Sequence, residues 1–408
     1  MDIRGYARKS AQVIFGVGLA QLIALALIPI VTRLYSPVEF STYSTYLYVT
    51  SLASTLLIFR FDNILIPIKF SAKRSLIFAY FLTTYFWIFI VFFIAFVGFS
   101  LAFDTSAQGV NLFVFVLGSI ATAIFQFVMG ALVSKSAYKK ISVLRMAQAG
   151  ALGGGQIAFS FIVILHDLGL MLGDAISRLV ALALYGRSLV FSSPSRFVRG
   201  FYVFRKVVKP LFAQSAFSTL STLLSTASLL SPIFFLGLLA EDETSVALFL
   251  LSYKLLAVPV SLISRSMAQV FLGEGQKLAG AEVRKAVKKV VAINGSIALL
   301  VCAVVMVVAP WVEPALGENW GGTSAYVRAL LPLTFGQMVL HPVVQVYILK
   351  NKNQEILWWE VIRWILVHLA VIVAYLIGVR DSLFLVLVYS FAMGGAYLML
   401  LIRILRIA

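Results

Sequence analysis

The stretch VVAINGSIALLVCAVVMVVAPWV at residues 290–312 is 23 residues long and carries no charged side chain. An α-helix needs about 20 consecutive apolar residues to cross the roughly 30 Å hydrocarbon core of a bilayer. The stretch therefore predicts a transmembrane helix. Further uncharged windows of 21 residues or more include 10–32, 75–103, 105–134, 211–240 and 382–402.

The composition of the whole chain agrees with these windows. Of its 408 residues, 61% are hydrophobic and 12% are charged, and the mean hydropathy is +1.00. Soluble domains are about 45–50% apolar and about 25% charged, so soluble enzymes, nucleic-acid-binding proteins and secreted disulfide scaffolds are excluded. The single cysteine, Cys302, lies in an apolar window. We therefore expect no disulfide and no metal cluster. The sequence contains no phosphate-loop or ATPase motif, and we expect no cofactor.

Charged and turn-rich breaks divide the sequence into twelve predicted helices. Twelve such helices in 408 residues leave little chain outside the bilayer, so we expect an all-α polytopic membrane protein. The predicted helices are 10–32, 40–62, 75–100, 109–134, 143–165, 168–187, 211–239, 244–271, 287–311, 323–349, 354–378 and 382–404.

A long polar loop suggests that these helices form two halves. The basic stretch 191–210 follows the sixth helix and separates a six-helix bundle at 1–190 from another at 211–408. Three landmarks of the first half recur in the second half at offsets of 203 to 205 residues: Pro29, Glu39 and Arg60 correspond to Pro232, Glu243 and Arg265. Duplicated halves around a midplane site are common in transporters, so we expect two pseudo-symmetric bundles.

The distribution of basic residues predicts the orientation in the membrane. With a cytoplasmic amino terminus, one side of the predicted topology collects 25 of the 33 Lys and Arg residues. Positively charged loops face the cytoplasm, so we expect both termini there. The net charge of +17 then reflects inner loops beside anionic lipid, and we expect no nucleic-acid partner.

Three short motifs carry a family resemblance: GLAQ at 18–21, PIVTRLYSPVEF at 29–40 and RFD at 60–62. They resemble the polysaccharide transporters of the multidrug/oligosaccharidyl-lipid/polysaccharide (MOP) exporter superfamily, where a similar P-x-x-x-R-x-x-x-P-x-x-[FY]-G-x-[FY] stretch joins the first two helices. Ser41 stands where that pattern has glycine. Within the superfamily the chain resembles the Wzx-type flippases. The resemblance implies a MOP/MATE-like fold in the bacterial inner membrane and transport of undecaprenyl-pyrophosphate-linked oligosaccharide, as in O-antigen export.

Several cations fall inside the predicted spans, where ionisable groups are costly and mark functional sites. Lys254 lies near the midplane, and Arg265 follows eleven residues later on nearly the same helix face. Arg and Lys bind phosphate groups, so both are candidates for pyrophosphate binding. Arg60, late in the second helix, and Arg328, in the tenth, complete the candidate set. The resemblance implies similar roles for arginines on the second and eighth helices. A buried ion pair at Lys254, and snorkelling at Arg60 and Arg265, are the structural alternatives.

A second group of ionisable residues suggests ion coupling or gating. Asp174 and Arg178 are spaced i,i+4, and Glu360 and Arg363 are spaced i,i+3, so each pair forms either a structural ion pair or a coupling site. The remaining candidates are Asp62 beside Arg60 and His368 in the eleventh helix. The coupling ion is expected to be H+ or Na+.

The predicted function is therefore that of a lipid-linked oligosaccharide flippase that works by alternating access. A multidrug or cation antiporter of the same superfamily is the main alternative, and a membrane polysaccharide polymerase is a further one. The predicted outer loops are short and contain no cluster of histidines or paired carboxylates, so we expect no enzyme. A polysaccharide polymerase and a chain-length regulator are candidate partners.

Overall fold

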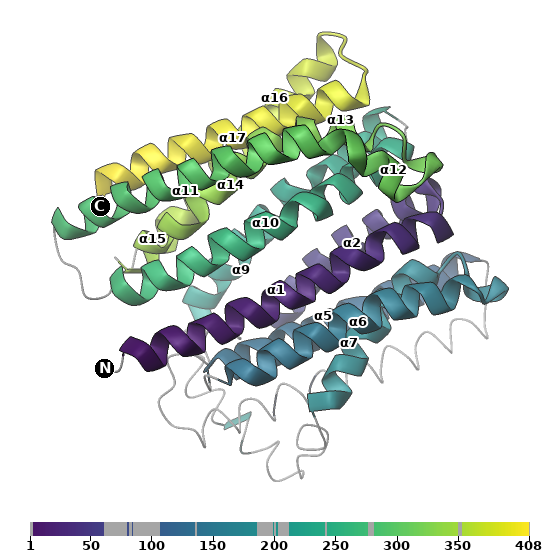
Figure 1. Cartoon of the computed structure of the whole chain (residues 1–408), viewed down its shortest axis with the longest axis horizontal. Coiled ribbons are helices and arrows are strands. Elements are labelled where there is room, and N and C mark those ends of the chain that lie inside the picture. Colours follow the sequence, from purple (N-terminus) through teal and green to yellow (C-terminus); the bar gives the residue numbers. More distant parts are fainter. Residues whose placement is uncertain are drawn as a thin grey trace. The chain divides into compact units, whose positions relative to one another are not determined.

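The structure of the chain, a computed structural model, describes residues 3–60, 80, 84, 107–134, 137–185, 199, 201–202, 212–240, 243–275, 281–349 and 353–407. Every regular element in these residues is a helix, and most of the described residues belong to helices (Figure 1). The predicted helix at 75–100 and the predicted linker at 191–210 lie outside the described residues, apart from a few positions. The boundaries predicted for two bundles at 190 and 211 stay a prediction.

The chain forms two compact units. The first unit contains Met1–Leu34 and Tyr46–Leu223, and the second contains Tyr35–Thr45 and Leu224–Ala408. The helices in the first part of the chain are α1 (Ile3–Leu34), α2 (Pro37–Ile58), α5 (Ala107–Ser134), α6 (Tyr138–Ser160) and α7 (Gly169–Tyr185). Those in the later part are α9 (Phe212–Phe235), α10 (Glu243–Gly275), α11 (Ala281–Val308), α12 (Val312–Leu316), α13 (Thr323–Ala329), α14 (Leu331–Val343), α15 (Gln345–Leu349), α16 (Asn353–Leu376) and α17 (Ser382–Ile407).

In the first unit, α6 packs against both α1 and α7, and α7 also packs against α5. Small residues permit this close packing. Gly153 of α6 faces Leu27 of α1, and Gly155 faces Gly173 of α7 so closely that a Cβ on Gly155 would lie 3.4 Å from the Gly173 Cα. Apolar side chains of α5, α6 and α7 complete the core: Phe125, Val128, Met129, Leu132, Ile141, Leu144 and Ala181.

In the second unit, α14 packs against α10, α11 and α17, and α16 packs against α17 (Figure 1). Val260, Ala298, Met338 and Val339 form a buried cluster between α10, α11 and α14. By contrast, only 11% of the apolar span that includes α11 is buried. Because an apolar surface of this size is unfavourable in water, α11 is suited to contact with lipid.

Six helices of the described chain are long and apolar enough to cross a membrane. They cover 112–132, 215–238, 243–264, 282–316, 354–376 and 382–407. A seventh span results if the helical segments Glu318–Ala329 and Leu331–Tyr347, which are bent by 49° relative to one another, are counted together. The prediction of an all-α polytopic membrane protein is confirmed.

Two predicted helix boundaries need correction. The helix predicted at 323–349 is broken into α13, α14 and α15, with turns at Leu330 and Val344. Pro332 and Pro342 lie close to the two breaks, and proline removes a backbone hydrogen bond and disfavours a continuous helix. The helix predicted to reach residue 62 ends at Ile58, because Phe59 and Arg60 adopt left-handed conformations with φ of 49° and 50°.

Candidate functional site

The motif at 29–40 forms the turn between α1 and α2 and begins α2 with a capping box. The Glu39 carboxylate accepts hydrogen bonds from the Ser36 backbone N–H at 2.6 Å and the Ser36 hydroxyl at 2.7 Å. The Glu39 N–H donates in return to the Ser36 hydroxyl at 3.4 Å. Pro37 takes the first helical position, which has no need of an N–H. The motif is therefore a helix start, and Phe40 follows it with its ring 4.8 Å from that of buried Trp320.

The same turn holds a tyrosine that stays neutral at physiological pH. Tyr35 is 2% exposed. Burial, followed by the charge of Glu39, raises the pKa of Tyr35 to about 12. The phenol therefore adds no charge to the turn.

Arg60 directly follows the end of α2. Left-handed backbone conformations are uncommon for residues other than glycine, and here two occur in succession at Phe59 and Arg60. The ring of Phe59 stacks on Phe212 at 4.9 Å between centroids. This contact orients the turn that carries the half-buried Arg60 side chain. Asp62, its proposed neighbour, lies outside the described residues.

Lys254 lies in α10, eleven residues after Glu243 and therefore roughly 16 Å along the helix. Its ammonium is 4.3 Å from the centroid of the Tyr43 ring, and Tyr43 is 2% exposed. This cation–π contact holds the charge at a defined position inside the second unit. The backbone of Arg265 belongs to the same helix, but its side chain lies outside the described residues.

Arg328 occupies a different environment. It lies in the last turn of α13 and is exposed. It interacts electrostatically with Glu313. The Glu313 carboxylate also accepts hydrogen bonds from Gly322 N–H at 3.1 Å, Ser324 N–H at 2.9 Å and the Ser324 hydroxyl at 2.5 Å. Glu313 thereby caps the start of α13.

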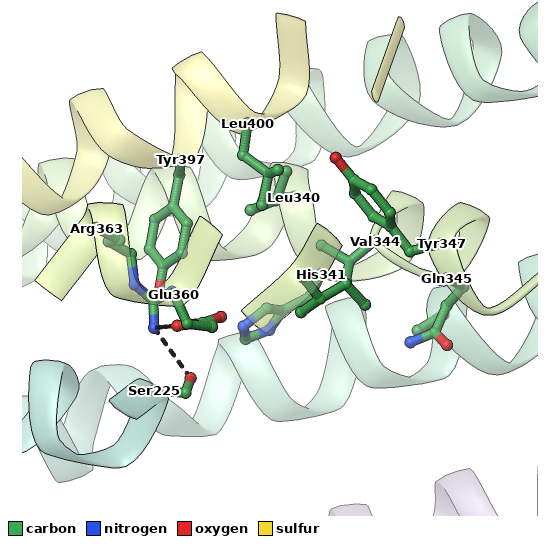
Figure 2. Close-up of a pocket in the computed structure, with 12 residues that line it drawn as sticks. Ser225, Leu340, His341, Val344, Gln345, Tyr347, Glu360, Arg363, Tyr397 and Leu400 are labelled. Carbon is green, nitrogen blue, oxygen red and sulfur yellow. Dashed lines mark hydrogen bonds and ion pairs between the residues drawn. The ribbon is translucent and has the colours of Figure 1, made fainter. Parts of the chain in front are cut away.

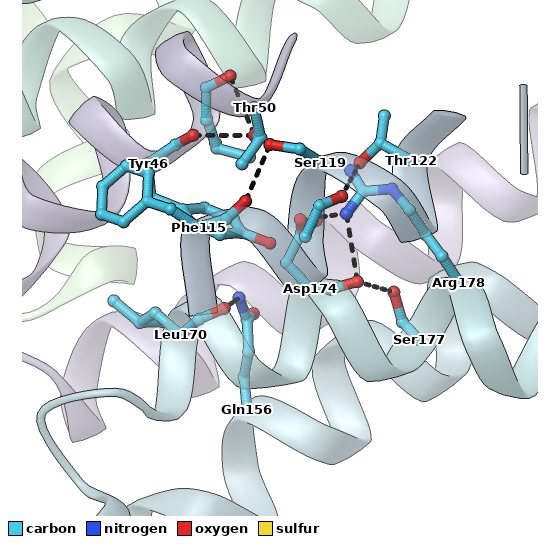
Figure 3. Close-up of polar contacts among 12 residues, drawn as sticks. Tyr46, Thr50, Phe115, Ser119, Thr122, Gln156, Leu170, Asp174, Ser177 and Arg178 are labelled. Atoms are coloured by element: carbon cyan, nitrogen blue, oxygen red, sulfur yellow. Dashed lines mark hydrogen bonds and ion pairs between the residues drawn. The ribbon is translucent and has the colours of Figure 1, made fainter. Parts of the chain in front are cut away.

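Asp174 and Arg178 form an ion pair along α7 of the first unit (Figure 3). Asp174 is 3% exposed. The Arg178 guanidinium also donates to the Asp174 backbone carbonyl at 3.1 Å, and the Ser177 hydroxyl donates to the same carbonyl at 2.7 Å. The predicted i,i+4 pairing is confirmed, whereas a coupling role stays a prediction.

The second predicted pair, Glu360 and Arg363, lies in α16 and is also formed (Figure 2). Arg363 donates to the Ser225 hydroxyl of α9 at 3.0 Å and lies 5.2 Å from the centroid of the Tyr397 ring of α17. Glu360 is 8% and Arg363 is 3% exposed. The pair therefore ties α16 to α9 and α17 inside the second unit.

These residues line a cavity of about 260 Å³, which we name the Glu360 cavity. Its polar lining comes from Ser225, His341, Gln345, Tyr347, Glu360, Arg363 and Tyr397. The broken end of α14 forms one wall, since Val344 lies at the turn between α14 and α15. Irregular backbone at membrane depth is tolerated where it lines such a cavity.

The histidine of this cavity is not the one predicted from sequence. His368 is absent from the cavity lining. Its ring lies 4.5 Å from that of Trp364, and its Nδ1 is 2.7 Å from the Trp364 carbonyl oxygen. His341 lines the cavity instead. A histidine directly before Pro342, near a helix break, is the signal in the sequence that could have indicated it.

Across the described residues, no three or more histidine, cysteine, aspartate or glutamate side chains form a group that could hold a metal ion. The charged residues that are buried in the described part of the chain are Asp174 in one unit and Glu360 and Arg363 in the other, and the half-buried Lys254 lies on Tyr43. Such an arrangement can bind an anion, hold a proton or brace helices.

No protein-family model and no curated protein matches the chain in sequence. Solved structures match it in fold. An inward-facing multidrug resistance MATE family transporter of the MOP superfamily superposes with a TM-score of 0.70 at 15% identity, over 96% of each chain. An outward-facing structure described in the same terms gives 0.62 at 15% identity, over 98% of this chain and 94% of that one.

A third solved structure comes from Pyrococcus furiosus. It is a MOP superfamily transporter for which a reverse polarity of the binding pocket is said to suggest a different function. Its TM-score is 0.64 at 14% identity, over 97% of this chain and 95% of that one. At such identities the likeness concerns the fold. The chain therefore has an all-helical, MATE-like membrane-protein fold over nearly its whole length.

Proposed function

We propose that the chain is a membrane transporter that works by alternating access. Solved structures with its fold include inward-facing and outward-facing conformations of one kind of transporter. The polar cavity beside a broken helix in the second unit supports the same proposal, because discontinuous helices are typical of transporter binding sites. H+ or Na+ is the proposed coupling ion, and the bacterial inner membrane the proposed location.

We further propose that the substrate is an anionic lipid, undecaprenyl-pyrophosphate-linked oligosaccharide. The observation that carries this proposal is the pairing of both buried carboxylates of the described helices. Asp174 is held by Arg178, and Glu360 by Arg363, each along its own helix. An organic cation would have to displace an arginine from either carboxylate.

The charge balance of the predicted spans supports the same substrate. Among the candidate site residues of these spans, six cations, Arg60, Arg178, Lys254, Arg265, Arg328 and Arg363, stand against three carboxylates, Asp62, Asp174 and Glu360. A cationic interior favours an anionic substrate, and Arg and Lys recognise phosphate. The motif at 29–40, which resembles polysaccharide transporters, supports a sugar cargo. A polysaccharide polymerase and a chain-length regulator are then the proposed partners.

A multidrug antiporter is the second candidate, because several solved structures with this fold are multidrug transporters. The transporter from Pyrococcus furiosus, described as having a pocket of reverse polarity, supports the view that one fold accommodates pockets of either sign. The two candidate functions differ in the charge of the substrate, so substitutions of Lys254 distinguish them.

The test uses purified full-length protein in nanodiscs and two probes: a polyprenyl-pyrophosphate-linked oligosaccharide and the organic cation ethidium. We expect the anionic probe to bind, with affinity falling in the order wild type, Lys254→Arg, Lys254→Ala and Lys254→Glu. Arginine keeps the charge but changes its geometry, and glutamate repels the pyrophosphate. Lys288→Ala, a change at an exposed basic residue of α11, is the matched control and should bind like wild type.

Two results would contradict the proposal. The first is full binding of the anionic probe by a folded Lys254→Glu protein. The second is tight ethidium binding by wild type without binding of the anionic probe, which would favour the multidrug candidate.

A further inference from the structure

His341 lies at the carboxyl end of α14, next to Pro342 and three residues before the turn at Val344, after which α15 begins at Gln345. Its imidazole lines the Glu360 cavity, and Figure 2 shows the ring directed toward the side where Glu360 and Arg363 lie. A histidine is the side chain whose ordinary titration falls between pH 5 and 8. His341 therefore combines a titratable imidazole with the buried carboxylate of Glu360 in one cavity.

Among the described residues that line the cavity with His341, the acidic one is Glu360. The groups that line the cavity from each neighbouring helix are Ser225 of α9, Ala268 of α10, Tyr347 of α15, Glu360 and Arg363 of α16, and Tyr397 of α17. The helix α11 contributes no lining residue. A further charged pair, Glu355 with Arg403 at 3.2 Å, interacts with Tyr347 and does not line the cavity.

The cavity is suited to water. Arg363 Nε and the Tyr347 hydroxyl are buried and make no hydrogen bond within the described part of the chain. Buried polar groups require partners, and a volume of about 260 Å³ has room for several water molecules of about 30 Å³ each. Water in the cavity would give a proton a path to the imidazole.

We propose that His341 and Glu360 form a proton-binding site in the Glu360 cavity. A lone pair of the imidazole takes H+ from a hydronium ion and leaves water. The resulting imidazolium then competes with Arg363 for the one carboxylate of Glu360. Because Arg363 also holds Ser225 of α9, protonation weakens the connection between α9 and α16. The claim that this protonation drives transport rests on the proposed function. The claim that His341 binds a proton is independent of it.

The first test measures protonation directly. Purified full-length protein in nanodiscs is labelled with diethyl pyrocarbonate, which reacts with neutral imidazole, and the labelling of His166, His341 and His368 is followed by mass spectrometry from pH 5 to 8.5. We expect His341 labelling to fall as the pH is lowered. In Glu360→Gln the midpoint should move to lower pH by about one unit, since a nearby carboxylate favours the charged imidazolium.

The control is Glu355→Gln, which removes a carboxylate of the same helix that does not line the cavity. It should leave the His341 midpoint unchanged, and the melting temperature of each variant reports that it is folded. No titration of His341 in this range, or equal midpoints in wild type and a folded Glu360→Gln, would overturn the proposal.

A second measurement covers the case in which Glu360→Gln does not fold. Potentiometric titration of wild type and His341→Gln between pH 8 and 5.5 should show one proton fewer bound by the variant. Equal proton uptake would overturn the site.

A transport measurement connects the site to the proposed function. In proteoliposomes, His341→Gln should still move the oligosaccharide lipid down its gradient but should lose the acceleration caused by a pH gradient. Undiminished acceleration would overturn the coupling role. If wild type moved no substrate while His341 titrated as expected, the proposed function would fail and the proton site would stand.

Discussion

Two glycines on neighbouring helices provide a matched test of how the first unit is packed. Gly173 of α7 lies against α6, where an added Cβ would be 2.7 Å from Gln156 Cγ and 2.9 Å from the Gln156 backbone nitrogen. Gly154 of α6 is exposed, and a Cβ there would meet nothing within 4 Å. The perturbation is the same in both cases: glycine to alanine within a helix.

The difference in the free energy of unfolding follows from these contacts. Alanine is about 1 kcal/mol more favourable than glycine within a helix, so Gly154→Ala should stabilise the protein by up to that amount. Gly173→Ala has the same backbone advantage. Its Cβ, however, meets the backbone of α6, which cannot rotate away, and such overpacking costs about 1–3 kcal/mol. The two variants should therefore differ by about 1–3 kcal/mol.

The Gly173→Ala substitution should also disturb the contact between α6 and α7 near Asp174. Gln156 donates to the Leu170 carbonyl of α7 at 3.1 Å (Figure 3), and the clash at Gly173 would push these helices apart beside Asp174. We expect Gly173→Ala to have a lower melting temperature than wild type, and Gly154→Ala to have an equal or higher one, in purified protein followed by intrinsic fluorescence. Equal melting temperatures for the two variants would refute the close approach of α6 and α7.

The remaining predictions concern charges. Asp174→Asn and Arg178→Gln should each destabilise the protein by more than the double variant does. Removing one partner of a buried ion pair leaves the other charge uncompensated, at a cost of about 3–5 kcal/mol. Additive losses in a double-mutant cycle would contradict this prediction. Glu313→Gln should cost about 1 kcal/mol through the weakened cap of α13, whereas Glu318→Gln, at an exposed position, should change the melting temperature little. The raised pKa of Tyr35, about 12, means that its contribution is present below pH 10 and is lost as the pH rises toward 12, because the unfolded phenol ionises first. The melting temperature of Tyr35→Phe should therefore fall less than that of wild type between pH 9 and 11, and an identical fall would contradict the burial of this phenol.

Features that depend on neighbours along the chain can be predicted from the amino-acid sequence. Uncharged windows predict the helices because an apolar helix satisfies its own backbone hydrogen bonds. The spacing from Asp174 to Arg178 and from Glu360 to Arg363 predicts both ion pairs, since residues three or four apart share one helix face. The capping box at Ser36–Glu39 is local in the same sense.

The helix faces that meet are known only from the packing of the folded chain. Lys254 and Tyr43 are more than 200 residues apart in the sequence, yet the ammonium lies on the ring. The cavity brings His341 to Glu360 from another helix, while His368, closer to Glu360 in the sequence, lies against Trp364. The turn at Val344 between α14 and α15 lines the same cavity. Contacts between helices depend on the rotation of each helix and on close approaches such as Gly155 to Gly173, and no periodicity within a single helix determines them.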